Sequence, residues 1–177
     1  MNKKTLKLTL CGVFIALMCI SAIISFPVPF SPAPITMQTA VVFLVALLLG
    51  KNLGTLVMTV YLLMGTLGMP VFSGFGSGIG HILGVTGGFL IGFIPASFVI
   101  GFLNEKLRTQ KVVKASASCI AGLIIIYLFG VVWFSVVSGT NFVSALFVVG
   151  TPFIPGDLIK MVLAIIIYIK IEKHLRS

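Results

Sequence analysis

Six long apolar segments, joined by short connections, constrain the fold of this chain more than any other feature. A membrane-spanning helix needs about 17–25 mostly apolar residues, and we expect such helices near 8–26, 36–50, 53–69, 82–103, 115–138 and 156–172. The chain is 59% hydrophobic and only 8% charged, whereas soluble domains carry about 25% charged residues. The sequence therefore predicts an all-α integral membrane protein in which residues 1–177 form a single transmembrane domain.

Basic residues are confined to alternate connections between these segments. All but one of the 12 Lys and Arg residues lie at the two termini, between the second and third segments, or between the fourth and fifth. Because cytoplasmic connections carry the excess of Lys and Arg, we expect six transmembrane helices with both termini in the cytoplasm. No basic cluster is interleaved with exposed aromatic residues, so the net charge of +9 does not indicate nucleic-acid binding.

The connections on the opposite side, near 27–35, 70–81 and 139–155, carry no Lys or Arg. The first is rich in proline, and the second is rich in glycine with two phenylalanines. Apolar, uncharged loops are unusual as free, solvated segments, but non-helical backbone is tolerated at membrane depth where it lines a cavity. We therefore expect these loops to fold over the outer half of the bundle and to enclose an outward-facing pocket.

Asp157 and Lys160 open the last apolar segment, in the sequence PGDLIK at 155–160. An ionisable residue in a membrane segment costs about 2.5–3.5 kcal/mol on insertion scales and indicates a functional site. The i, i+3 spacing puts both side chains on one helix face, with Lys160 roughly 4.5 Å deeper. We expect this pair at the floor of the pocket. The alternative is an aspartate that only stabilises the helix dipole, with a lysine that extends outward or pairs with it.

Five further residues are candidates for the pocket. Thr36 and Gln38, together with Thr39, precede the second helix and either contact a ligand or only cap that helix. Thr86 and Phe89 lie in a glycine-rich stretch that either faces the pocket or only permits close helix packing. The aromatic residues Trp133, Tyr61, Tyr127 and Tyr168 are most simply membrane anchors or core residues.

The sequence lacks the residues that several kinds of catalysis need. The sequence has no G-x-x-x-x-G-K-[ST] motif for ATP hydrolysis, and no His, Cys, Asp or Glu cluster with metal-ligand spacing. An enzyme that used Asp157 or His81 would lack a second catalytic group and a nucleophile. We therefore expect no enzyme, no metal site and no resident cofactor.

Four stretches carry a resemblance to a known family: PAPITMQT (32–39), YLLMGTLGMPVF (61–72), GVTGGFLIGF (84–93) and PGDLIK (155–160). In this order they resemble the BioY family, the biotin-specific substrate-binding (S) components of energy-coupling factor (ECF) transporters. The resemblance extends from about residue 10 to the C-terminus. It implies an S-component-like bundle of six helices in a bacterial-type plasma membrane, with biotin bound near the outer face.

The resemblance also implies roles for particular residues. The acidic and basic residues that open the last helix contribute to the family's site, which carries over to Asp157 and Lys160. The glycine-rich loop contributes too, and its counterparts here are Phe75, Gly76, Ser77 and Gly78. Small residues on the first helix, here Gly12 and Ala16, would dock to a membrane coupling protein, although they could equally serve packing inside the bundle.

The function implied is therefore high-affinity biotin binding by the specificity subunit of an ECF-type ABC vitamin transporter. Its partners would be the ECF transmembrane coupling protein and two ABC ATPases, which hydrolyse the ATP in place of this chain. The alternative is a solitary facilitator or an ion-coupled carrier of biotin or another small solute, which needs no ATPase.

Overall fold

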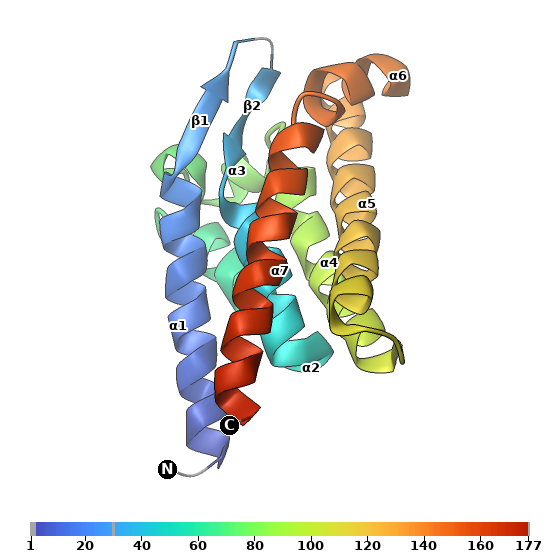
Figure 1. The fold of residues 1–177 in the computed structure, drawn as a ribbon. Coiled ribbons are helices and arrows are strands. Elements are labelled where there is room, and N and C mark those ends of the chain that lie inside the picture. The colour runs from blue at the N-terminus through green and yellow to red at the C-terminus, as the bar shows by residue number, and fades with distance from the viewer. Residues whose placement is uncertain (1–2, 30, 177) are drawn as a thin grey trace.

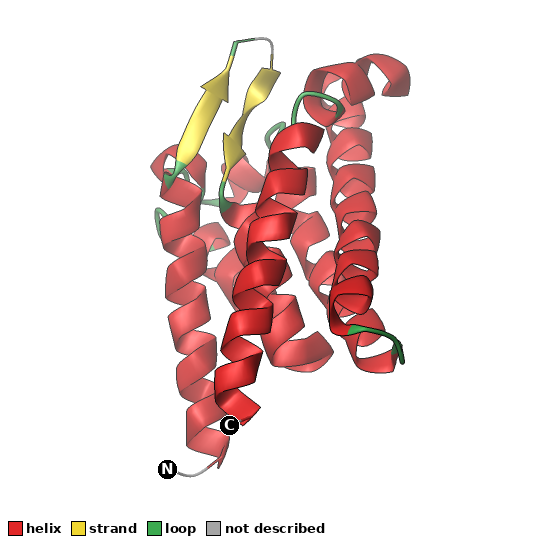
Figure 2. Ribbon diagram, viewed as in Figure 1, coloured by secondary structure: helices red, strands yellow, loops and turns green. Residues whose placement is uncertain are grey.

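The computed structural model describes residues 3–29 and 31–176 and shows helices that run side by side in one bundle (Figure 1). The long helices are α1 (Lys3–Ile23), α2 (Gln38–Thr66), α4 (Gly87–Lys106), α5 (Lys111–Ser138) and α7 (Ile154–Arg176). Shorter elements connect them (Figure 2): β1 (Ser25–Val28), β2 (Ser31–Thr36), the 3-10 turn η1 (Ser73–Phe75), α3 (Ile79–Leu83), α6 (Phe142–Ala145) and the π-helical turn η2 (Leu146–Gly150).

The long helices have the length and composition of membrane spans. In the described part of the chain, α1, α2, α4 and α5 are long and apolar enough to cross a bilayer, and the bent pair formed by residues 142–150 and α7 can supply a fifth span. Their outer surfaces are apolar: Leu8, Ile124 and Val136 are 74%, 64% and 75% exposed. Because an apolar surface of this extent needs a partner other than water, the helices confirm the prediction of a multi-pass membrane protein.

The helix α2 reverses direction at Gly50, where the backbone leaves the helical region with φ 73° and ψ −177°. Gln38 Nε2 donates a hydrogen bond of 2.7 Å to the hydroxyl of Tyr61, although 23 residues of continuous helix would span about 35 Å. The two ends of α2 can meet only if the chain folds back. The two arms of α2 therefore correspond to the separate helices expected near 36–50 and 53–69.

The end of α4 satisfies the backbone groups that the break at Gly50 leaves free. In a continuous helix the N–H of Lys51 would bind the carbonyl of Leu47, but here it donates to Glu105 Oε1 at 3.1 Å. Asn104 Nδ2 donates to that Leu47 carbonyl at 3.4 Å and to the hydroxyl of Tyr168 at 3.3 Å. Two neighbouring side chains of α4 thus close the turn and connect it to α7.

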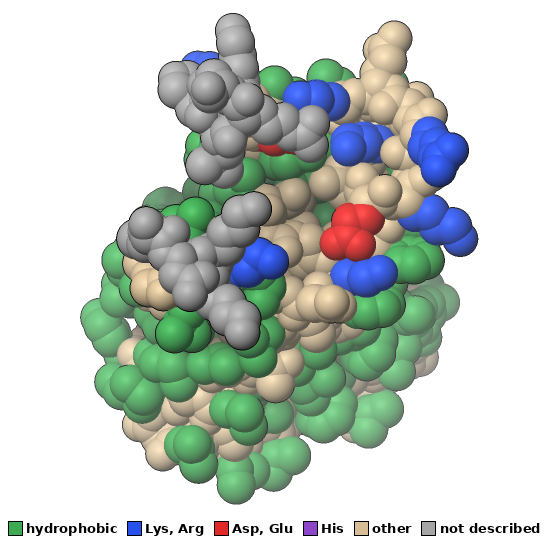
Figure 3. Space-filling model, turned by 90° about the horizontal axis from the view of Figure 1, so that it is seen from below, with side chains coloured by type: hydrophobic (Ala, Val, Ile, Leu, Met, Phe, Trp, Pro, Cys, Tyr) green, Lys and Arg blue, Asp and Glu red, His purple; other side chains and the backbone are tan. Residues whose placement is uncertain are grey.

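The break at Gly50 lies at one end of the bundle, together with the start of α1, the end of α7 and the connection between α4 and α5 (Figure 1). Seen from this side, Lys and Arg side chains gather over the surface (Figure 3). Lys51 pairs with Glu105 at 3.5 Å, and Lys111 pairs with Glu172 at 3.3 Å. The structure therefore collects at one end, called the basic end below, the connections that the sequence predicts to be basic.

At the opposite end, called the hairpin end below, the connections between the long helices are more regular than the loops that the sequence predicts. The strands β1 and β2 pair as an antiparallel hairpin in which Ser25 pairs with Thr36 and Val28 with Ser31. A two-stranded sheet has only edge strands, and these tolerate proline even though it lacks an N–H. The other two expected loops contain η1 and α3, and α6 and η2.

The fourth long helix begins later than expected near 82, because α3 ends at Leu83 and α4 starts only at Gly87. A side chain at Gly87 would collide with the carbonyl of Ile82, so only glycine fits where the two helices meet.

Two apolar clusters hold these elements together. The larger one fills the bundle between α1, α2, α4, α5 and α7, with Phe43, Met58 and Ile100 almost fully buried. The smaller one joins the hairpin to α5, α6, η2 and the segment before α7, through Ala33, Val131, Phe134, Ala145, Val149 and Phe153. The smaller cluster fixes the hairpin over the end of the bundle and so creates the roof of the site described below.

Replacement of Asn104 by alanine tests the role of the closure at Gly50. Asn104→Ala leaves the Leu47 carbonyl without its partner, so we expect the free energy of unfolding to fall by about 1–3 kcal/mol. Reversible unfolding in mixed detergent micelles measures the change. Asn52→Ala, at an exposed position in the same turn, is the matched control, and equal stability of the two variants would contradict the proposed closure.

Candidate functional site

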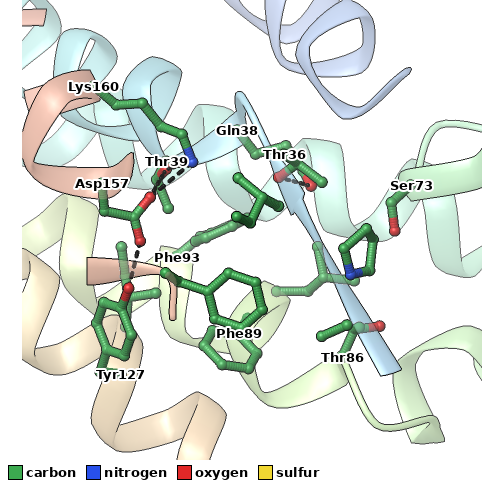
Figure 4. Close-up of a pocket in the computed structure, with 16 residues that line it drawn as sticks. Thr36, Gln38, Thr39, Ser73, Thr86, Phe89, Phe93, Tyr127, Asp157 and Lys160 are labelled. Atoms are coloured by element: carbon green, nitrogen blue, oxygen red, sulfur yellow. Dashed lines mark hydrogen bonds and ion pairs between the residues drawn. The ribbon is translucent and has the colours of Figure 1, made fainter. Parts of the chain in front are cut away.

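A pocket lies beneath the hairpin, between β2, the start of α2, α4, α5 and α7 (Figure 4). The space between its lining residues, with the open mouth included, is about 590 Å³. Its lining consists of Ala33, Pro34, Ile35, Thr36, Gln38, Thr39, Ser73, Thr86, Phe89, Leu90, Phe93, Ile126, Tyr127, Phe153, Asp157 and Lys160. Seven of the residues considered from the sequence are among them: Thr36, Gln38, Thr39, Thr86, Phe89, Asp157 and Lys160.

The floor of the pocket is the ion pair of Asp157 and Lys160, in the first turns of α7. The i, i+3 spacing on the helix brings Lys160 Nζ within 2.8 Å of Asp157 Oδ1. Both residues are buried, at 5% and 7% exposure. Lys160 therefore points into the bundle rather than outward, so the pair is available to the pocket.

Two hydroxyl groups from other helices complete this ion pair. Thr39 Oγ1 donates to Asp157 Oδ1 at 2.8 Å, and the hydroxyl of Tyr127 donates to Oδ2 at 2.7 Å. Lys160 Nζ also donates to Thr39 Oγ1 at 3.3 Å. The carboxylate thus receives three hydrogen bonds, from α2, α5 and α7, which fix its orientation in an apolar surrounding where unpaired charge is costly.

A second polar group lies at the start of α2. Thr36 Oγ1 donates to Gln38 Oε1 at 3.0 Å (Figure 4), and Gln38 Nε2 donates to Tyr61. The N-cap of α2 is Met37, and no side-chain hydrogen bond caps the helix. The alternative in which Thr36, Gln38 and Thr39 only cap this helix is therefore wrong, because their side chains bond to one another, to Tyr61 and to the ion pair.

Aromatic and aliphatic side chains form the wall between the two polar groups. The ring of Phe89 meets Tyr127 edge to face, with 6.3 Å between centroids. Gly130 of α5 allows this arrangement, because a side chain there would collide with the Phe89 ring. Phe93, Leu90, Ile126 and Phe153 complete the apolar surface. The pocket therefore suits a ligand with an apolar body and polar groups at its ends.

The glycine-rich loop reaches the pocket through Ser73 rather than through the four residues expected there. Among the described lining residues, Phe75, Gly76, Ser77 and Gly78 are absent, and Phe75 is 63% exposed. Gly78 instead donates its N–H to the carbonyl of Gly65 at 2.7 Å, which holds the loop against the end of α2. The structure thus does not bring these four residues to the pocket, and their contact with a ligand stays a prediction.

A second hollow opens between the hairpin and the glycine-rich loop. It shares Pro34, Ser73 and Thr86 with the pocket and adds Pro27, Pro32 and His81 among others. The imidazole of His81 stacks on Phe72 with 5.1 Å between centroids, and burial lowers its pKa below the ordinary value. The shared residues show that this hollow adjoins the pocket.

Sequence reasoning missed one residue of the floor, Tyr127. It lies in the middle of an apolar helix, and the sequence around it does not distinguish it from Tyr61 or Tyr168. Thr39 was expected, with Thr36 and Gln38, either to contact a ligand or to cap the second helix, but its bonds to the ion pair were not foreseen. Tyr127 and Asp157 are 30 residues apart, and Thr39 and Asp157 are 118 apart, so only the fold joins them.

Gly12 and Ala16 lie on a surface of α1 that faces away from the bundle. Both residues are exposed, and a side chain added at Gly12 would meet no atom within 4 Å. Packing inside the bundle therefore does not explain these small residues. They leave a shallow strip on α1 that a helix of another protein could approach closely.

Comparison with known proteins places the chain among transport proteins. Residues 1–177 match the model of the BioY family. A protein of Thermotoga maritima described as "Biotin transporter BioY" is 43% identical over 164 residues, which cover 92% of this chain and 93% of that protein. A "Probable biotin transporter BioY" of Pyrococcus horikoshii is 39% identical, over 93% of this chain and 94% of the other.

A solved structure has the same fold. It is the crystal structure of the S-component for biotin from an ECF-type ABC transporter, and it superposes with a TM-score of 0.91 at 29% sequence identity, covering 98% of this chain and 95% of that chain. The match over nearly the full length includes α7, the helix that carries the ion pair. Together with the family match over residues 1–177, it shows that this chain belongs to the BioY family.

Proposed function

We propose that this chain is the biotin-binding S component of an ECF-type ABC vitamin transporter, with its site in the pocket beneath the hairpin. The names of the two relatives and of the solved structure support biotin as the ligand. The main support for the site itself is the hydrogen bonding of the buried pair of Asp157 and Lys160.

This pair keeps one acceptor position and one donor for a ligand. A carboxylate has about four lone-pair sites and an ammonium has three N–H groups. Thr39 and Lys160 use Asp157 Oδ1, Tyr127 uses one site of Oδ2, and Lys160 uses two of its N–H groups. Within the described residues, this leaves one site on Oδ2 and one N–H on Lys160. A cyclic urea such as that of biotin presents an N–H beside a C=O, which complements this arrangement.

The remainder of the pocket supports the same ligand. Biotin has an apolar bicyclic ring and an aliphatic chain that ends in a carboxylate. Phe89, Phe93 and Ile126 would enclose the apolar part, and the polar groups of Thr36, Gln38 and Thr86 would meet the polar atoms that remain. Phe75, Gly76, Ser77 and Gly78 would join the site if the glycine-rich loop closes over the bound ligand.

The proposed orientation puts the hairpin end outside the plasma membrane and both termini in the cytoplasm. If the two arms of α2 each cross the bilayer, then α1, the two arms, α4, α5 and α7 make six spans. The Lys and Arg residues collected at the basic end support this orientation through the positive-inside rule. The pocket then faces the medium from which a vitamin is captured.

Transport would require partner proteins. The exposed strip of Gly12 and Ala16 on α1 would dock to the ECF transmembrane coupling protein, which in turn binds two ABC ATPases that hydrolyse ATP. The S component would tilt in the membrane against this coupling module and so expose the pocket to the cytoplasm. A solitary carrier of biotin is the competing function, and uptake by the chain expressed without partners distinguishes the two.

Equilibrium binding of labelled biotin to the purified protein tests the ligand and the site. We expect Asp157→Asn and Lys160→Met each to weaken binding roughly 10- to 100-fold, because each removes a charge-assisted hydrogen bond. Glu105→Gln and Lys51→Met alter the matched ion pair at the basic end and should leave the affinity unchanged. A folded wild type that does not bind biotin would overturn the ligand, and full binding by both pocket variants would overturn the site.

A bulky residue on the exposed strip of α1 tests the docking surface. We expect Ala16→Leu to abolish co-purification with the coupling protein and the ATPases, because the leucine fills the space that the partner helix needs. Biotin binding by the isolated variant should be unchanged. The same substitution at the exposed Ala117 of α5 is the control, and an intact complex with Ala16→Leu would rule out this surface.

A further inference from the structure

Tyr61 is a fully buried residue whose phenol the sequence gives no reason to link to the pocket. It lies in the second arm of α2, is 1% exposed, and does not line the pocket. Its hydroxyl nevertheless lies between two groups that matter for the site. It receives the hydrogen bond from Gln38 Nε2 at 2.7 Å and donates to the carbonyl of Val71 at 2.9 Å.

The direction of these two bonds determines the orientation of the Gln38 amide. A backbone carbonyl can only accept a hydrogen bond, so the single proton of the Tyr61 hydroxyl must point to Val71. The phenol oxygen can then only accept from Gln38, which forces the NH₂ group toward Tyr61 and the carbonyl Oε1 toward Thr36. Thr36 Oγ1 donates to that Oε1 at 3.0 Å (Figure 4). The hydrogen bonds from Thr36 through Gln38 and Tyr61 to Val71 therefore all run in one consistent direction.

We propose that Tyr61 is a positioning residue that fixes Gln38 in the ligand-binding orientation and couples it to the glycine-rich loop. This inference rests on the proposed function of the pocket. With Tyr61 in place, Gln38 presents the free lone pair of Oε1 and its second N–H to a ligand. Without the hydroxyl, the buried amide can rotate by half a turn, exchanging donor and acceptor.

The contacts of Tyr61 explain how Val71 and Phe72 of the glycine-rich loop can influence the site, although neither residue lines the pocket. Val71 is part of the connection between α2 and η1 and is 8% exposed, while the neighbouring Phe72 is fully buried. The ring of Phe72 meets Tyr61 edge to face, with 5.7 Å between centroids, and stacks on His81. A shift of this segment therefore moves the acceptor that orients Tyr61, and through it the amide of Gln38.

A double-mutant cycle on biotin affinity separates positioning from a purely structural role. Tyr61→Phe keeps the ring and its packing on Phe72 but removes the hydroxyl, and we expect binding to weaken roughly three- to tenfold. In a Gln38→Ala background the same substitution should have no further effect, because no amide remains to be oriented. Equal effects of Tyr61→Phe in both backgrounds would show that Tyr61 only supports the fold, and would overturn the proposal.

Tyr168→Phe is the matched control, since it removes a buried tyrosine hydroxyl near the basic end and should leave affinity unchanged.

A measurement made without ligand tests the orientation of Gln38 independently of whether biotin binds. The side-chain amide signals of Gln38 in an NMR spectrum, assigned by their loss in Gln38→Ala, should shift and exchange faster with water in Tyr61→Phe. Unchanged Gln38 signals in Tyr61→Phe would overturn the inference even if biotin did not bind.

Discussion

The rest of this structure depends on one constraint: inside a bilayer the protein must supply every partner for its own backbone N–H and C=O groups. The long helices meet most of this requirement internally, and at two departures from helix another segment provides the missing partner. At Gly50 the partners are Asn104 and Glu105 of α4. At the hairpin end they are the paired strands β1 and β2 and the carbonyl of Gly65, which binds Gly78. Irregular backbone is thereby confined to the two ends of the bundle.

The same apolar surrounding gives the buried ion pair its character. A buried pair of charges contributes little net stability, because desolvation offsets the attraction between them. This small net contribution supports the proposal that Asp157 and Lys160 serve binding. Thr39 and Tyr127 hold them in one geometry before a ligand arrives, which lowers the entropic cost of binding. Their unused donor and acceptor positions then become the strongest polar partners in the pocket.

The pocket wall combines segments that are remote in the sequence, and this makes it sensitive to movements at the hairpin end. The hairpin is anchored through Ala33 to the smaller apolar cluster, which also contains Phe153 of the pocket wall. The glycine-rich loop is anchored through Val71 and Tyr61 to Gln38. Each outer segment thus lines the pocket with side chains of its own and is also joined to it through a buried neighbour.

The sequence by itself determined the membrane class, the clustering of basic residues at one end, and the pairing of Asp157 with Lys160. These features depend on segment length, on composition and on an i, i+3 spacing, all of which are local. Only the tertiary structure decided that Tyr127 and Thr39 complete the ion pair, that the proline-rich run forms a hairpin, and that Phe75, Gly76, Ser77 and Gly78 lie outside the pocket wall. Tyr127 has the same apolar surroundings in sequence as other buried tyrosines. Its role follows from the partner that packing brings to its hydroxyl, and that partner is set by contacts between distant segments.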